Sequence, residues 1–348
     1  MYKHNYLTKN QILKRFSEMG DPLEKVTKHI NFEIFRPTLE KTIIPQNHNP
    51  KKGGRPRYDP ILMFKILLLQ DWYNISDHTI QYQINDRHSF QRFLNLQTND
   101  KVPDENTIWD FKEALAKNDT DKQLFEQFTQ QLENRGIIKH EGSIVDASFV
   151  DAPRQRNTRE ENQQIKNGQI PQEWKNKPHK LAQKDTDVRW TKKNNETHYG
   201  YKDHINVDEK TKLITKFAVT SASVHDSQKL VDVLSVKDKK GYVDSAYVGE
   251  ELHAQVALLY PELVLLLCCA KAFRNKPLTD AQRAANRLIS SVRVRVEYVF
   301  GFMSVSMGGM VICCVGLVRV GAQIARRNLA YNFKRYAYLA GARLIPVI

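Results

Sequence analysis

The chain has few cysteines, and they are arranged unlike those of a metal site. Four of its 348 residues are cysteine, in two adjacent pairs, Cys268-Cys269 and Cys313-Cys314. Adjacent cysteines lack the spacing of a zinc site, and neighbouring side chains point in different directions, which disfavours a disulfide within a pair. We therefore expect four reduced, buried thiols, which are typical of proteins from a reducing compartment.

The sequence also lacks a long apolar segment. Its longest apolar-leaning run, residues 302–318, is interrupted by Ser304 and Ser306 and followed at once by Arg319. A membrane-spanning helix needs roughly 20 apolar residues, so this run predicts buried core. The polar N-terminal residues lack the apolar centre of a secretory signal. We expect a cytoplasmic protein with no membrane partner; a membrane-surface role for the apolar and basic C-terminal stretch is a weaker alternative.

Acidic residues are scarce towards the C-terminus. The formal net charge is +14, and from Arg274 onward twelve Lys and Arg face only two acids, Asp280 and Glu297. A surplus of this size predicts a polyanionic partner. A glutamate isolated in such a basic stretch is a candidate for a functional role.

Three regions differ in composition. Residues 1–57 have few apolar clusters and end in a Pro-, Gly- and Arg-rich segment, so we predict an N-terminal arm and linker. Residues 58–142 predict several short helices, which suit a helical DNA-binding domain as well as any other small bundle. Residues 143–340 combine strands with helices and a polar insertion at about 152–197, and therefore predict an α/β (α+β) catalytic domain.

Three acids stand in contexts that suit catalysis. Asp146 lies within the apolar strand pattern SIVDASFV, Asp244 ends the strand pattern GYVD, and Glu297 shares a polar helical face with Arg293. Carboxylates that converge from separate elements are what two-metal cleavage of a phosphodiester requires. Each acid also has a structural alternative, namely a surface or turn-capping Asp and an Arg293–Glu297 ion pair.

A group of basic residues lies in the segment HYGYKDHINVD. His198, Lys202 and His204 occur at even spacing, so on a strand they share one face. An exposed hairpin is the alternative interpretation. We expect His225 and Asp226 to organise a strand end, because no third ligand for a histidine-bound zinc is placed nearby.

The segments IVDASFVDAPRQRN, HYGYKDHINVD, GYVDSAYVG and RVRVEYVFGFM, in this order, resemble the DDE transposases of bacterial insertion sequences. The resemblance is to the insertion sequence five family and the related insertion sequence four type, and it covers roughly residues 50–335. It implies a ribonuclease H-like core in which Asp146, Asp244 and Glu297 hold two divalent ions, Mg²⁺ or Mn²⁺. The implied activity is metal-dependent phosphodiester hydrolysis and transesterification, by which the ends of a mobile element are cut and transferred.

The resemblance also implies DNA contacts and partners. Arg293 fits an arginine of the family pattern, and His198 and Lys202 are expected to line the active site, with Lys202 near a phosphate. Arg55 and Arg57 are candidates for holding the transposon ends through phosphate contacts. The expected partners are double-stranded DNA, as transposon ends and target, and a second copy of the chain, as a homodimer on DNA. The expected location is the bacterial cytoplasm, in association with the nucleoid.

Two positions depart from the family pattern. A basic residue is expected seven positions after Glu297 and a tyrosine seven positions before it, but the chain has Ser304 and Ser290 there. A decayed or domesticated transposase that acts only as a DNA-binding protein is therefore one alternative. A ribonuclease H-like nuclease without strand transfer is another.

Overall fold

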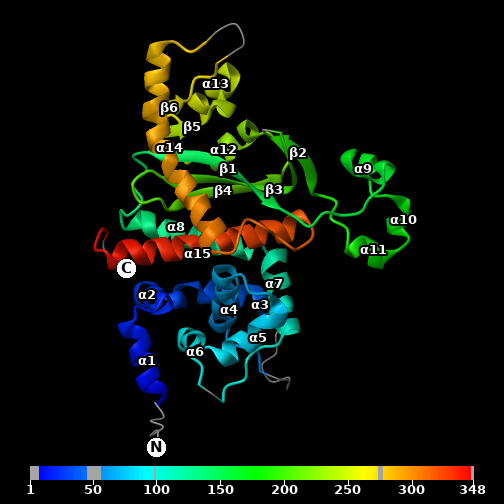
Figure 1. Cartoon of the computed structure of the whole chain (residues 1–348), viewed down its shortest axis with the longest axis vertical. Coiled ribbons are helices and arrows are strands. Elements are labelled where there is room, and N and C mark those ends of the chain that lie inside the picture. Colours follow the sequence, from blue (N-terminus) through cyan, green and yellow to red (C-terminus); the bar gives the residue numbers. More distant parts are fainter. Residues whose placement is uncertain (1–7, 45–55, 98, 194, 273–276, 346–348) are drawn as a thin grey trace, which may run out of the picture. The chain divides into compact units, whose positions relative to one another are not determined.

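The computed structural model describes residues 8–44, 56–97, 99–193, 195–272 and 277–345 (Figure 1). The contacts within the chain divide it into two compact units. Unit 1 consists of Met1–Ile137, Ser306–Gly308 and Ala325–Ile348, and unit 2 consists of Ile138–Val305 and Gly309–Ile324. Unit 1 therefore joins the N-terminal part of the chain to its C-terminal end.

Unit 1 is helical. Its elements are α1 (Lys9–Glu18), α2 (Pro22–His29), η1 (Phe32–Phe35), α3 (Arg36–Ile43), α4 (Pro60–Tyr73), α5 (Asp77–Asp86), α6 (His88–Leu94), α7 (Glu105–Lys117), α8 (Thr120–Asn134) and most of α15 (Leu317–Gly341). Helix α4 begins where the Asp59 side chain accepts hydrogen bonds from the backbone of Ile61 and Leu62, and it ends at Asn74 in the left-handed region. Because α4 is apolar on nearly all sides, it is buried over most of its length.

An aromatic cluster forms the centre of unit 1. Phe333 of α15 lies 5.7 Å from Phe35, 6.5 Å from Phe64 and 4.8 Å from Phe128, measured between ring centroids. All four rings are fully buried. The tilted and edge-to-face geometries are those that aromatic rings prefer. The C-terminal helix is therefore part of the core around which the N-terminal helices pack.

The N-terminal segment differs from the arm and linker that its composition predicts for residues 1–57. Helices α1 to α3 occupy much of its described part, and Leu23, Phe32 and Leu39 are buried. The Phe32 ring lies 5.5 Å from Phe333. Its apolar residues are too sparse to give a clear helical pattern, but they pack against residues that are distant in sequence.

Unit 2 contains a six-stranded mixed sheet. Its strands are β1 (Ser143–Asp151), β2 (Arg189–Lys193), β3 (Glu196–Asp208), β4 (Ile214–Ser221), β5 (Lys240–Val243) and β6 (Leu265–Cys268). The strand order is β2-β3-β1-β5-β6, and β4 also pairs with β3. Strand β3 is antiparallel to β1, β2 and β4, whereas β5 is parallel to β1 and β6. The mixed sheet and its helices confirm the expected α/β fold class.

Helices accompany this sheet. They are α9 (Arg159–Lys166), α10 (Gln172–Lys175), α11 (Pro178–Ala182), η2 (Asp226–Lys229), α12 (Leu230–Val233), η3 (Ser245–Tyr247), α13 (Glu250–Leu259) and most of α14 (Asp280–Ser306). Helices α9 to α11 lie in the polar insertion and project beyond the sheet, at the right of Figure 1. Helix α14 begins with the predicted capping box, in which the backbone N–H groups of Thr279 and Gln282 donate to each other's side chains.

The structure also bears on the predictions made for the cysteines and for the longest apolar run. The four cysteines are free, as predicted. The prediction that all four are buried was wrong, because Cys313 is exposed in the connection between α14 and α15. No helix in the described ranges is both long enough and apolar enough to span a bilayer.

Candidate active site

Asp146 and Asp244 lie where two parallel strands separate. Strands β1 and β5 pair over only two residue pairs, of which Ile144–Tyr242 is the last. Asp146 follows two residues later on β1, and Asp244 directly follows β5. Both carboxylates therefore emerge where the paired strands diverge, which is a usual position for ligand-binding side chains in α/β sheets.

The guanidinium of Arg293 links the two aspartates. Its Nη2 donates to Asp146 Oδ2 at 3.2 Å, and its Nη1 lies 3.7 Å from Asp244 Oδ1. The Arg293 side chain is only 17% exposed, and its Nε has no hydrogen-bond partner among the described residues. One positive charge from α14 thus lies against two carboxylates, one on β1 and one directly after β5. It reduces their mutual repulsion but leaves a net negative charge.

The two aspartates have different environments. Burial raises the pKa of Asp146 above its ordinary value, although Arg293 and the backbone N–H of Ala147 act to lower it and Asp244 acts to raise it. Desolvation therefore outweighs the attraction of the guanidinium. Asp244 is more exposed, at 40%, and its Oδ1 caps η3 by accepting a hydrogen bond from the backbone of Ser245.

Glu297 lies one helical turn beyond Arg293 on α14, and its side chain is exposed. Within the described ranges, no three His, Cys, Asp or Glu side chains are grouped so that they could hold a metal ion. The structure therefore brings Asp146, Asp244 and Arg293 together. It places Glu297 on the helix that supplies Arg293, without closing a three-carboxylate cluster.

Two further residues next to the aspartates were not predicted from the sequence. Tyr247 is fully buried, and its hydroxyl has no hydrogen-bond partner in the described part of the chain. Its pKa is raised, mainly by burial and secondly by the negative charge of Asp146. Cys268 Sγ donates to the backbone oxygen of Asp244 at 3.1 Å. The spacing of Tyr247 three residues after Asp244 was an available signal, because a tight helical turn brings such residues together. Cys268 gave no such signal, since it reaches Asp244 only through the pairing of β5 with β6.

The basic residues of β3 lie on the other face of the sheet. Asp146 is paired with Ile205, and directly paired residues of antiparallel strands point to the same face. His198, Lys202 and His204 are even-numbered on β3 and therefore point away from the face of Asp146.

These β3 residues have partners within the protein. Lys202 is buried, and its Nζ donates to Asp226 Oδ1 and to the backbone oxygen of Val224, both at 2.7 Å. The His198 ring stacks on Phe149 with a centroid distance of 4.0 Å and an interplanar angle of 8°. A phosphate contact by Lys202 would require its buried ion pair to open.

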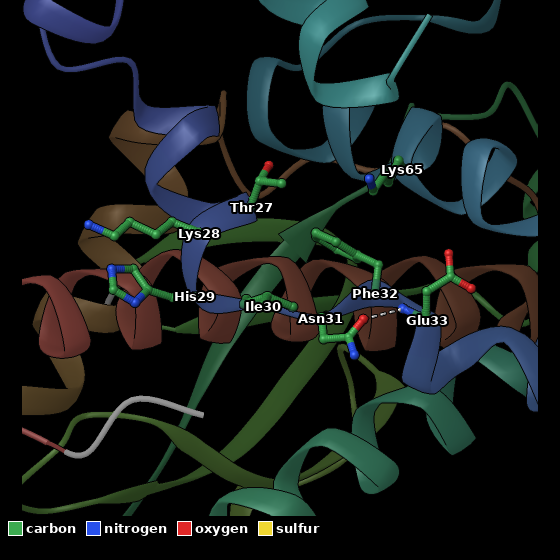
Figure 2. Close-up of a pocket in the computed structure, with 8 residues that line it drawn as sticks. All are labelled: Thr27, Lys28, His29, Ile30, Asn31, Phe32, Glu33 and Lys65. Carbon is green, nitrogen blue, oxygen red and sulfur yellow. Dashed lines mark hydrogen bonds between the residues drawn. The ribbon is translucent and has the colours of Figure 1, made fainter.

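Of the two DNA contacts that are predicted near the start of the chain, the structure describes one. Arg55 lies outside the described residues. Arg57 donates from Nη1 to the backbone oxygen of Ile43 and lines a hollow of about 350 Å³. A second hollow of about 360 Å³, lined by residues 27–33 and Lys65, contains none of the predicted site residues (Figure 2).

Family comparisons cover most of the chain. Residues 138–333, more than half of its length, match the family described as Transposase DDE domain. The chain belongs to the DDE transposase family. Residues 11–114 of the transposase match a second family, described as Transposase domain (DUF772).

The transposase is therefore an enzyme with a ribonuclease H-like core, as predicted, and its family generally uses divalent metal ions. A cryo-EM structure of a piggyBac transposase synaptic complex with hairpin DNA aligns with 94% of this chain and 77% of that chain. The two share 12% sequence identity, and the TM-score is 0.46.

Proposed function

We propose that this transposase binds the terminal inverted repeats of an insertion sequence and catalyses metal-dependent DNA strand cleavage followed by strand transfer. The observation that carries the proposal is the convergence of Asp146 and Asp244 on one guanidinium at the point where β1 and β5 separate. Arg293 neutralises only one of the two negative charges, so these carboxylates, of which Asp146 is partly buried, need a further cation.

The donor set suits a hard divalent cation. Asp146 and Asp244 offer carboxylate oxygens, which Mg²⁺ and Mn²⁺ prefer, and neither imidazole nor thiolate is required. Glu297 is the third proposed ligand, because it lies one turn from Arg293 on α14. Two bound ions would stabilise charge on the attacking and leaving oxygens of a phosphodiester.

The proposed roles of the protein's own residues are positional and electrostatic. The rigid pairing of β1 holds Asp146 against Arg293, and η3 fixes the Asp244 carboxylate through its cap. Arg293 contacts both carboxylates, so bound ions would compete with it there, and its guanidinium would then be free to bind a phosphate oxygen of the DNA. The site would thus orient a water molecule for cleavage and then the freed 3′-hydroxyl for transfer, without a covalent protein intermediate.

The remaining parts of the proposal concern the DNA contacts and the assembly. We assign DNA recognition to residues 58–142 and catalysis to residues 143–340, with Arg55, Arg57, His198 and Lys202 as further candidates for DNA contacts. The net charge of +14 supports phosphate binding by many side chains. Two element ends must be joined, so we propose a homodimer on DNA. We also propose membership of the insertion sequence five family or the related insertion sequence four type, and a cytoplasmic location near the nucleoid.

The test is cleavage of a plasmid that carries the element and its flanking DNA, in Mg²⁺. Asp146→Asn, Asp244→Asn and Glu297→Gln should each reduce cleavage to background while DNA affinity stays within about twofold, because one missing charge hardly alters the total phosphate attraction. Asp280→Asn is the matched control, since Asp280 is an acid on α14 with a 97% exposed side chain.

Each outcome has a definite meaning. Normal cutting by any of the three variants would remove that residue from the site. Cut but unjoined products from the wild-type chain would favour the nuclease alternative. DNA binding without cutting by the wild-type chain would favour the decayed transposase. That alternative rests on Ser290 and Ser304 of α14, which depart from the family pattern.

A further inference from the structure

An exposed tryptophan lies at the edge of the catalytic sheet. Trp190 is on β2, the first strand in the sheet order, and is 45% exposed. The other tryptophan of unit 2, Trp174, is fully buried, and its Nε1 donates to Glu161 Oε1 at 2.6 Å. An exposed ring of this size on a catalytic unit needs an explanation, because burying it would be favourable.

The ring is held in place from one side. Trp190 pairs directly with Tyr199 on β3, and their ring centroids are 4.5 Å apart at an interplanar angle of 40°. Tyr199 is buried, and burial raises its pKa to about 12, so it is a neutral phenol at physiological pH. Trp190 is therefore a supported, pre-oriented surface ring and not a loose one.

Cations lie beside this ring. The Arg154 guanidinium lies over it in a cation–π contact, with its carbon 5.4 Å from the Trp190 ring centroid. The sequence of β2 is RWTKK, so it has three cations in five residues and no acid. Lys192 is exposed and, two residues from Trp190, points to the same face. An aromatic surface bordered by cations matches the bases and phosphates of a nucleic acid strand.

The sheet register places this ring on the catalytic face. Trp190 pairs with Tyr199 and Asp146 pairs with Ile205. Tyr199 and Ile205 are six residues apart on β3, so Trp190 and Asp146 point to the same face. Six residues of strand span about 20 Å, which is the length of about six nucleotides of a DNA strand.

We propose that Trp190 is a stacking platform for an unpaired DNA base, with Arg154 and Lys192 binding the adjacent phosphates. The base would belong to the strand that leads to the phosphate held at Asp146 and Asp244, about six nucleotides away. This inference rests on the proposed function, because it assumes that DNA occupies the face of Asp146. It adds a site that recognises the unpaired state of the strand.

The test compares two fluorescein-labelled probes of one sequence, a single strand and the corresponding duplex, bound to the full-length protein in Ca²⁺ to prevent cleavage. Trp190→Ala should weaken single-strand binding about 10-fold or more and change duplex binding less than about twofold. Trp190→Phe, which keeps an aromatic face, should retain most of the affinity. Thermal unfolding of each variant identifies any general loss of structure.

Tyr338→Ala is the matched control, because Tyr338 is a 62% exposed aromatic residue on α15, outside the residues proposed to recognise DNA. It should leave the preference for single strands unchanged. The stacking platform would be contradicted if Trp190→Ala bound the single strand as tightly as wild type. It would also be contradicted if Trp190→Ala lost affinity equally for both probes, or if Trp190→Phe lost as much single-strand affinity as Trp190→Ala. A wild-type chain that binds neither probe would instead contradict the proposed function and the inference with it.

Discussion

At the scale of single residues, unit 2 contains several polar side chains that are largely buried and have specific partners. Arg293 bridges two aspartates, and Lys202 is held by Asp226. His204 has no exposed surface, and its Nε2 lies 2.9 Å from Thr220 Oγ1. Burial of this kind fixes protonation states, because a charged form without water needs a compensating partner.

His204 makes stability depend on pH. Burial lowers its pKa from 6.5 to about 4, so between these values the unfolded chain binds a proton that the folded chain excludes. The neutral, buried His204 therefore imposes no loss of unfolding free energy above pH 6.5, and the unfolding free energy falls as the pH falls from 6.5 towards 4. From pH 7.5 to 5 this residue should remove about 2 kcal/mol of unfolding free energy.

The measurement is chemical denaturation at both pH values. His204→Gln should lose less stability on acidification than wild type, because the titrating group is gone. His78→Gln is the control, since the His78 side chain is 86% exposed. An identical pH dependence in wild type and His204→Gln would show that His204 accepts a proton in the folded state.

At the scale of elements, the pairing of β1 with β3 positions the site. This ladder runs from Ser143–Asp208 to Asp151–Gly200 and so includes Asp146 near its centre. It also determines which side chains share the face of Asp146. A disturbance at the Gly200 end would therefore affect both the catalytic strand and the neighbouring β2.

Gly200 is required by the close approach of β1. A Cβ at this position would lie 2.0 Å from the backbone oxygen of Val150, which cannot move without disturbing the ladder. Gly200→Ala should destabilise the protein by about 2 kcal/mol or more, in the range typical of overpacking. Gly301→Ala is the control, because a Cβ on α14 at Gly301 meets nothing within 4 Å and alanine is a better helix former. Urea unfolding should show opposite signs for the two changes, and an equally stable Gly200→Ala would contradict the close approach.

At the scale of the whole molecule, the C-terminal helix completes the N-terminal helical unit. Arg326 of α15 donates from Nε to Asp71 Oδ2 at 2.7 Å and from Nη1 to Asp121 Oδ1 at 3.3 Å. All three residues are buried, and burial raises the pKa of Asp121 to about 6 although Arg326 acts to lower it. Residues about 200 or more positions apart thus form one charge network in unit 1.

Removal of the cation should therefore destabilise unit 1. Arg326→Met leaves two buried carboxylates without their cation and should lower the free energy of unfolding by about 3–5 kcal/mol. Arg319→Met, an exposed position on the same helix, is expected to change it by less than about 0.5 kcal/mol. Urea titration followed by circular dichroism measures both variants. Equal midpoints for the two would contradict a structural role of the network.

Some features were decided by the sequence alone, because their causes are local. The strand contexts of Asp146 and Asp244, the α14 helix with Arg293 four residues before Glu297, and the capping box at its start all follow from residues within one or two turns. The mixed α/β fold class follows from the change of periodicity along the chain. Family membership, too, could be inferred from the order of short segments.

Other features depend on contacts between distant residues, and only the tertiary structure decided them. Strand register placed His198 and Lys202 on the face opposite Asp146 and placed Trp190 on the same face, because a shift of one residue exchanges the two faces. The packing of α15 joined the C-terminus to the N-terminal helices, whose sparse apolar residues gave a weak pattern. The Arg293 bridge likewise needs three elements brought together, and no local pattern specifies how such elements meet.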